Sequence, residues 1–292
     1  GTNMIAARQQ ADYYANINVN SGGRLVTAHT NGLYNVGASA SAIYPLIGVN
    51  YRMNFFLDPN STVEYAGTDT QVITGTGYGI ATTPNHRYGF LDINHQGTPD
   101  VEFAYPFDDS VVVRTGLVLT NGELNLDSDH ATAGGGRTLT VMNGATIART
   151  DGYIRSETED GSAALKWNIT TTGSFTVPFG YNSTNYIPFI YQPISGSSGD
   201  VVLATFHSAA DNTPYPPTVT HVRDFGGADN SANTVDRFWR IQVPGNVNST
   251  LTFSVTPAEL GGIVNPRAQL WEPVSLGWFP PSGIQFNAYM QR

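Results

Sequence analysis

The 292-residue chain contains no cysteine. This absence excludes disulfides, zinc–thiolate sites, iron–sulfur clusters and cysteine nucleophiles. Chains of this length without any cysteine are common among secreted proteins of bacteria that do not rely on disulfides. We therefore expect a secreted protein that is extracellular or attached to the cell surface.

Charged residues are scarce as well, at 13% of the chain, and the formal net charge is −9. Of the 14 cationic side chains, only Lys166 is a lysine. An anionic surface repels the phosphates of nucleic acids and anionic lipids, so we expect no nucleic-acid partner. No run of about 18 apolar residues is present, so we expect no membrane insertion.

The third absence is that of helical patterns. No stretch of about 12 residues repeats its apolar positions at the spacing of a helix face. The 31 glycines and 17 prolines, together with abundant Thr, Val, Tyr and Phe, favour many short strands joined by turns. We therefore predict an all-β protein, and the length is typical of about two domains.

The clearest repeated pattern lies in residues 117–147. Apolar residues alternate with polar ones on either side of two turns, Asn121-Gly122 and Asn143-Gly144, which are 22 residues apart. Alternation with a period of two predicts half-buried strands, and Asn-Gly supplies the positive φ of a tight turn. Repetition on this scale is typical of a solenoid, so we predict a parallel β-helix-like domain. A large β-sandwich with regularly placed turns is the alternative.

Three segments follow from these patterns. Residues 1–15 match no repeat and are predicted to be an N-terminal arm or cap. Residues 16–170 are predicted to form the β-helix-like solenoid, and residues 171–292 an antiparallel β-sandwich, because short alternating strands recur there between prolines. Strands are expected at residues 17–19, 24–26, 53–57, 61–65, 71–73, 88–93, 111–113, 164–169, 201–206, 237–241, 249–255 and 268–271.

Two parts of the chain resemble a known group of proteins. Residues 61–73 (STVEYAGTDTQVI) resemble a segment that recurs in large secreted surface proteins of the Bacteroidota. Residues 177–180 (VPFG), 186–188 (YIP) and 235–241 (VDRFWRI) resemble the signature of the domain that follows in such proteins. The resemblance spans most of residues 53–255. It implies export by the type IX secretion route and roles in adhesion, gliding or surface fibres, and it implies no catalytic residues.

Carboxylates in glycine-rich loops are the candidate metal ligands. Asp127 and Asp129 lie beside three consecutive glycines, and Asp224 and Asp229 lie in a loop rich in Gly and Asn. Oxygen ligands on a loop suit Ca²⁺, so we expect no resident cofactor other than possible Ca²⁺ at these loops. The spacing of Asp127 and Asp129 lacks the full twelve-residue calcium-loop pattern, and for Asp224 and Asp229 the alternative is a turn, in which Asp often bonds to its own backbone. Both interpretations stay open.

Aromatic residues are concentrated in the proline-rich C-terminal segment, where Trp271, Trp278, Phe279 and Tyr289 lie. If exposed, they predict contact with a glycan or with another subunit, and packing in the sandwich is the alternative. Ser110 stands in an Asp-Ser-Val triplet that resembles the O-glycosylation pattern of this bacterial group. We therefore predict it as a possible glycosylation site.

These observations favour a non-catalytic structural protein, either an adhesin segment or the subunit of a self-assembling filament. Open strand edges at the ends of a stack can pair with another chain, so the expected partners are copies of the protein in a head-to-tail homopolymer. Residues 1–15 and the segment after Arg267 are the expected contacts. The rival hypothesis is a polysaccharide-binding module or a β-helix polysaccharide lyase. Lyase chemistry needs clustered carboxylates or a well-placed base, which the sequence does not group.

Overall fold

The computed structural model describes residues 14–33, 52–74, 87–97, 100–103, 110–127, 136–224, 226–245 and 247–279. Strands dominate this part of the chain, in which the helical elements are η1 (Ser231–Asn233) and α1 (Pro257–Leu260). The prediction of an all-β protein is confirmed. No helix among the described residues has the length and apolar character needed to cross a bilayer.

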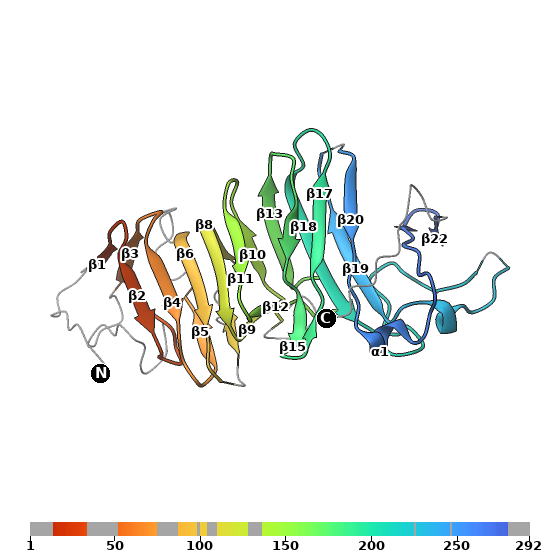
Figure 1. Ribbon diagram of the computed structural model, residues 1–292, viewed down its shortest axis with the longest axis horizontal. Helices are drawn as coiled ribbons and strands as arrows, with labels where there is room; N and C mark the ends of the chain where they lie inside the picture. The colour runs from red at the N-terminus through yellow and green to blue at the C-terminus, as the bar shows by residue number, and fades with distance from the viewer. Residues whose placement is uncertain are drawn as a thin grey trace.

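The largest sheet has nine strands that lie side by side along the long axis of an elongated molecule (Figure 1). They are β2 (Arg24–Thr27), β4 (Thr62–Tyr65), β6 (Arg87–Asn94), β8 (Ser110–Asn121), β10 (Thr138–Val141), β11 (Thr146–Arg149), β13 (Ala164–Ile169), β18 (Gly199–His207) and β19 (Arg237–Gln242). The order is β19-β18-β13-β10-β8-β6-β4-β2, and β11 also pairs with β8. Pairs from β2 to β13 are parallel, whereas β18 and β19 add in the antiparallel direction.

A second parallel sheet runs alongside the first. It contains β5 (Gln71–Ile73), β7 (Val101–Phe103), β9 (Glu123–Asn125) and β12 (Tyr153–Arg155), in the order β12-β9-β7-β5. A two-stranded parallel sheet of β1 (Tyr14–Val19) and β3 (Arg52–Leu57) completes this part. In the sequence, β5 follows β4, β7 follows β6, β9 follows β8 and β12 follows β11. The chain therefore alternates between the two sheets, and each return to a sheet adds the next strand of that sheet. We call one segment that contributes to both sheets a rung.

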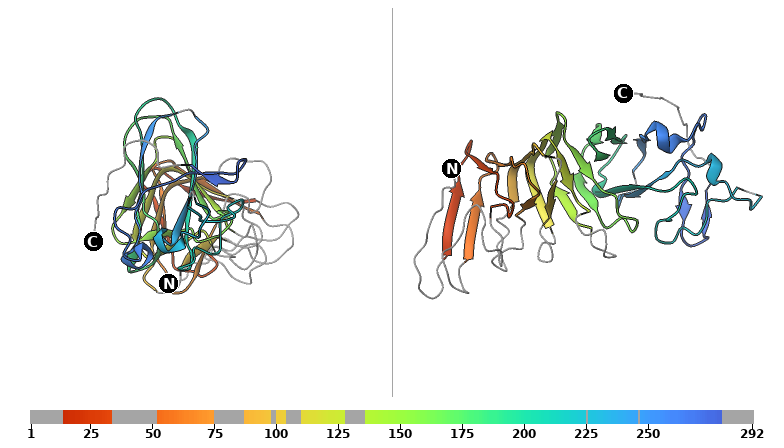
Figure 2. Two further views of the ribbon diagram at one scale, coloured as in Figure 1. Left: turned by 90° about the vertical axis from the view of Figure 1, so that its right-hand side faces the viewer. Right: turned by 90° about the horizontal axis from the view of Figure 1, so that it is seen from below.

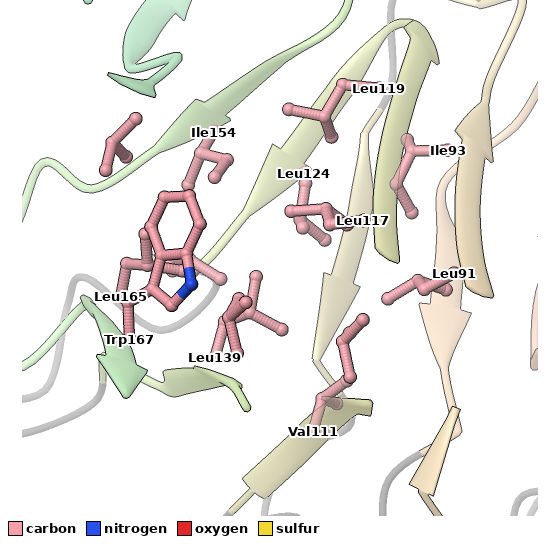
Figure 3. Packing of buried hydrophobic residues seen from close by; sticks show 14 of the residues in the cluster. Leu91, Ile93, Val111, Leu117, Leu119, Leu124, Leu139, Ile154, Leu165 and Trp167 are labelled. Carbon is pink, nitrogen blue, oxygen red and sulfur yellow. The ribbon is translucent and has the colours of Figure 1, made fainter. Parts of the chain in front are cut away.

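Side chains that point between the sheets form the core (Figure 3). Val63, Leu91 and Leu117 occupy consecutive register positions on β4, β6 and β8, and all three are buried. Leu124 and Ile154 are paired in the same way on β9 and β12 and are also buried. Full burial of such a side chain stabilises the fold by about 1.5–3 kcal/mol. The alternation seen in the sequence therefore places an apolar side chain of each strand next to one of the neighbouring strand, and these side chains form a continuous interior.

The two Asn-Gly turns have the positive φ that the sequence predicts, +83° at Gly122 and +79° at Gly144. Their positions differ, because Gly122 lies between β8 and β9, which belong to different sheets, whereas Gly144 joins β10 to β11, which both pair with β8. The spacing of 22 residues is therefore not the period of the stack. Val63 pairs with Leu91 and Leu91 with Leu117, which are spacings of 28 and 26 residues.

Beyond β13 the described strands pair antiparallel, and one isolated parallel bridge joins Phe179 to Ile154 of β12. β14 (Phe175–Val177), β17 (Phe189–Pro193) and β20 (Ser249–Thr252) form one sheet, β15 (Gly180–Asn182) pairs with β16 (Asn185–Tyr186), and β21 (Trp271–Glu272) pairs with β22 (Gly277–Trp278). The change in direction falls near the predicted boundary at residue 170. One buried hydrophobic cluster nevertheless continues across it, from Leu33 to Leu203. The predicted strands at 249–255 and 268–271 are strands only in part.

Candidate functional site

Residues 14–33 contain β1 and β2 and lie at one end of the stack, where β2 is the terminal strand of the large sheet. We call this segment the first rung, although it has no strand in the second parallel sheet. Leu25 of β2 is only partly buried, although its register partner Val63 on β4 exposes 1% of its surface. Ile17 and Val19 of β1 pack against the core in the same partly buried way. Val26 exposes 52% of its surface. The first rung therefore leaves apolar surface at the end of the stack.

The other end of the molecule carries a hairpin made of β21 and β22 (Figures 1 and 2). Trp271 and Trp278 are cross-strand partners, and their rings meet edge to face with 5.2 Å between centroids. The Trp278 indole N–H donates to the carbonyl oxygen of His221 at 2.8 Å, and the His221 ring packs against Trp271. Both tryptophans therefore hold the hairpin to its neighbouring loop. Phe279 is exposed, and Tyr289 lies outside the described residues.

The most exposed hairpin side chains are aliphatic, which the sequence analysis did not foresee. Val274 and Leu276 in the turn expose 89% and 51% of their surface, and Leu270 just before β21 is also exposed. The Glu272 carboxylate accepts hydrogen bonds from the backbone N–H groups of Ser275 and Val274, and these bonds lower the pKa of Glu272. A charged carboxylate thus shapes a turn whose aliphatic side chains face solvent.

Four ionisable residues lie along the second parallel sheet. We call this group of three carboxylates and one guanidinium (Asp100, Glu102, Glu123 and Arg155) the carboxylate face. Burial, together with the nearby charge of Asp100, raises the pKa of Glu102 to about 7. Glu123 accepts hydrogen bonds from the Tyr153 hydroxyl at 2.6 Å and from Arg155 at 3.5 Å, and burial raises its pKa. A carboxylic acid that titrates near 7 can donate a proton at neutral pH. The sequence did not reveal this group, because register alone brings β7, β9 and β12 together.

A buried ion-pair network is centred on Arg237, the first residue of β19. Its guanidinium donates to Glu157 at 3.0 Å and to Glu259 at 2.6 Å. The ring nitrogen Nδ1 of His207 lies 2.9 Å from the Glu157 carboxylate, and this hydrogen bond raises the pKa of His207. The network joins β18, β19, α1 and the loop after β12. The VDRFWRI stretch contains Arg237, but the resemblance implied no role for this residue.

One predicted pair of calcium ligands is described only in part. Asp127 is buried, and its Oδ2 atom lies 3.5 Å from Nε of Arg155. Asp129 lies outside the described residues. The position of Asp127 next to a guanidinium on β12 gives its carboxylate a charge partner from the protein itself. The structure therefore assigns Asp127 a contact with the carboxylate face.

The second predicted pair is used in turns. Asp224 accepts a hydrogen bond from the backbone N–H of Ala228 at 3.0 Å. Asp229 accepts one from the hydroxyl of Ser231 at 2.8 Å and one from its backbone N–H. These are the local bonds that Asp makes in tight turns. Among the residues that the structure describes, no group of three or more His, Asp or Glu side chains is arranged to hold a metal ion.

Ser110 is the first residue of β8, and its backbone is in register with Thr138 of β10. Its side chain is not among the described ones, so O-glycosylation there stays a prediction.

The two ends of the stack, the carboxylate face and the buried ion-pair network are the features from which we assign a function. Comparisons with protein-family models, with curated proteins and with solved structures found no match to this chain.

Proposed function

We propose that this protein is a non-catalytic extracellular structural protein whose copies assemble end to end, as an adhesin segment or as the subunit of a filament. The observation that carries the proposal is the terminal strand β2, where Leu25 and Val26 leave apolar surface at the end of the stack. Among the strands that the structure describes, none pairs with the outer edge of β2, and an open edge of this kind can bind a strand of another chain. Both features favour contact with a further copy.

The architecture that we propose is a parallel β-helix over residues 16–170 followed by an antiparallel β-sandwich over residues 171–292. The alternating visits to two parallel sheets support the first part. Contacts between the sheets support the second, because Phe189 of β17 and Trp239 of β19 both pack against the ring of Phe253. A stack in which each rung contacts its neighbours is typical of elongated structural proteins.

The two ends of the stack differ, and this difference favours an open assembly. One end is the parallel strand β2, and the other is β19, which is antiparallel to its neighbour and carries the exposed Arg240. A contact between two unlike ends is heterologous, so copies can be added without limit unless a ring closes. In an elongated molecule with its ends far apart, such addition gives a filament (Figure 1).

Secretion by the type IX route is part of the proposal. The absence of cysteine and the low charge fit an extracellular protein. Of the residues that resemble Bacteroidota surface proteins, 61–73 and 235–241 include β4, β5 and most of β19, whereas 177–180 and 186–188 lie at β14, β15 and β16.

Sedimentation velocity and negative-stain electron microscopy over a concentration series, with and without a calcium chelator, test this function. We expect oligomers that lengthen with concentration and become filaments. Val26→Lys should weaken assembly, because a lysine on an edge strand opposes pairing with another strand. Ile194→Lys is the matched control, since Ile194 is an exposed aliphatic residue next to β17. Particles of a single size at every concentration would contradict the proposal.

The carboxylate face favours a second candidate, a polysaccharide-binding module or a polysaccharide lyase. Burial and the nearby charge of Asp100 raise the pKa of Glu102 to about 7, a value that suits a general acid or base. Incubation with anionic and neutral polysaccharides, followed by measurement of unsaturated products and of reducing ends, tests this function. Turnover that Glu102→Gln abolishes and that Asp200→Asn, an exposed carboxylate on β18, leaves intact would replace the structural proposal.

A further inference from the structure

A row of outward-facing side chains crosses the large sheet from β6 to β19. Leu165 and Trp167 are buried in the core, so Lys166 between them points to the opposite face, and its register partners share that direction. The register pairs define the row as Arg87, Val112, Thr140, Lys166, Val202 and Gln242. The row follows the long axis of the molecule and passes from the parallel strands to the antiparallel ones (Figure 1).

Four cations lie on this side of the sheet. Arg87 and Lys166 are members of the row, and Arg240 donates a hydrogen bond to Oε1 of Gln242 at 3.2 Å. Arg114 on β8 is close to Arg87, because burial and the charge of Arg87 lower the pKa of Arg114. We call Arg87, Arg114, Lys166 and Arg240 the cationic face.

Most of this positive charge is held by neutral groups. Among the described residues, the acceptors of three of the cations are the sulfur of Met142 for Arg87, the backbone carbonyl oxygen of Leu57 for Arg114, and the backbone carbonyl oxygen of Gly161 for Arg240. Lys166 lies 3.9 Å from Asp200, and 37% and 52% of the two side chains are exposed, so this ion pair is weak. The cationic face therefore keeps a net positive charge that an external anion can neutralise.

The charge of this face is opposite to that of the whole chain. The protein has a formal net charge of −9 and only 14 cationic side chains, of which four lie here. An anion is therefore attracted to this face and repelled by the rest of the surface. The carboxylate face of another copy is a poor partner, because burial raises the pKa values of Glu102 and Glu123 and so disfavours their charged forms.

The spacing of the cations favours an extended anion. Arg87 and Lys166 are three strands apart in the row, which is about 14 Å for strands about 4.8 Å apart. One small anion cannot bridge this distance, whereas a chain with repeated anionic groups can. Between and beside the cations, the row offers the Thr140 hydroxyl, the Gln242 amide and two valines, which suit the hydroxyls and C–H groups of sugars. None of the residues in the row is aromatic, so the row has no platform on which nucleic-acid bases could stack.

We propose that the cationic face binds an acidic polysaccharide whose chain lies along the row, with carboxylate or sulfate groups on Arg87, Lys166 and Arg240. Guanidinium groups bind such oxyanions through paired, charge-assisted hydrogen bonds. The inference goes beyond end-to-end assembly and does not depend on it. It also places the polysaccharide on a different sheet from the carboxylate face, since the row lies on the large sheet.

Isothermal titration with oligosaccharides of polygalacturonate and with dextran sulfate tests the proposal, and an uncharged cello-oligosaccharide is the control ligand. We expect only the acidic chains to bind, and to bind more weakly as the salt concentration rises. The chain that binds more tightly identifies the anionic group. Arg87→Gln and Lys166→Gln should each weaken binding by about threefold to tenfold. Arg223→Gln is the matched control, because Arg223 is an exposed arginine outside the cationic face.

A variant that gains affinity keeps the test independent of folding defects. Thr140 lies between Arg87 and Lys166 in the row, so Thr140→Arg should tighten binding of the acidic chain by about threefold or more. Thr176→Arg, at an exposed position on β14 in another sheet, adds the same charge elsewhere and should leave the affinity unchanged. Equal gains from both variants would show that net charge alone is responsible and would overturn the proposal.

Two further results would also overturn the proposal. One is that neither acidic chain binds, or that Arg87→Gln and Lys166→Gln leave binding unchanged. The other is that a single-stranded oligonucleotide binds as tightly as the polysaccharide, since the face would then recognise any polyanion. Val26→Lys should weaken assembly and leave polysaccharide binding intact, so the failure of either proposal can be distinguished from the failure of the other.

Discussion

Arg237 and Glu259 form an ion pair of 2.6 Å in which neither side chain has more than 6% of its surface exposed. The pair joins β19 to α1, whose first turn is also closed by hydrogen bonds between Thr256 and Glu259. Glu157 contributes a second carboxylate from the loop after β12. A buried charge without a partner is far more costly than the intact pair is stabilising. The network therefore makes the C-terminal part of the chain sensitive to single substitutions.

Arg237→Met should lower the free energy of unfolding by about 3–5 kcal/mol, because it removes the cation bound to buried Glu259 and leaves buried Glu157 with His207 alone. Urea unfolding followed by tryptophan fluorescence measures the loss. Arg223→Met, at an exposed position, should change stability by no more than about 0.5 kcal/mol. Adding Glu157→Gln and Glu259→Gln to Arg237→Met should restore part of the loss. If it restores none, unpaired charge is not the cause.

His207 predicts a pH dependence of stability. The hydrogen bond that its ring donates to the Glu157 carboxylate raises the pKa of His207 above the ordinary value of 6.5. A raised pKa in the folded state gives a contribution that is fully present below 6.5 and is lost as the pH rises through the folded-state value. The urea midpoint of the wild-type protein should therefore fall as the pH is raised above 6.5, and His207→Asn should flatten this part of the profile. Identical profiles for the two proteins would contradict the prediction.

Glu102 predicts a gain in stability on substitution. Its pKa is about 7 in the folded protein, against an ordinary value of 4.5, so the folded state favours the protonated form. The corresponding stabilisation is present below 4.5 and is lost as the pH rises through 7. Glu102→Gln, which stays neutral, should be more stable than the wild type above pH 7 by about 1 kcal/mol, a value reduced for solvent screening. Near pH 4 the two should be equal in urea unfolding, and a difference that does not change with pH would contradict the prediction.

Gly122 and Gly144 predict unequal effects of the same substitution. A Cβ atom on Gly122 would lie 2.8 Å from Cβ of His95 and 2.9 Å from its carbonyl oxygen, whereas one on Gly144 would meet nothing within 4 Å. Gly144→Ala should cost only the left-handed backbone penalty of about 1–2 kcal/mol. Gly122→Ala should cost about 1–3 kcal/mol more, because its neighbours must also move. Thermal unfolding of the two variants measures the difference, and equal losses would mean that the segment around His95 yields freely.

Much of the fold could be predicted from local sequence patterns. Alternation located β4, β6 and β13, and both Asn-Gly turns have the expected φ. The period did not follow from those turns, because Gly122 and Gly144 occupy different places in their rungs. In the hairpin the tryptophans were identified, but the exposed aliphatic side chains of Val274 and Leu276 were not. Which side chains are exposed depends on packing against the loop at His221, which is distant in sequence.

The sequence by itself determined the all-β class, the positions of most strands and the residues at tight turns. These properties arise from interactions between residues two to four positions apart, which a single chain segment already contains. Only the tertiary structure decided which strands pair, which end of the stack is left with apolar surface, and which carboxylates meet. Those outcomes depend on contacts between distant segments, such as the hydrogen bond between Arg237 and Glu157, whose positions differ by 80. Local patterns carry no information on register over such separations, because every rung presents a similar alternation.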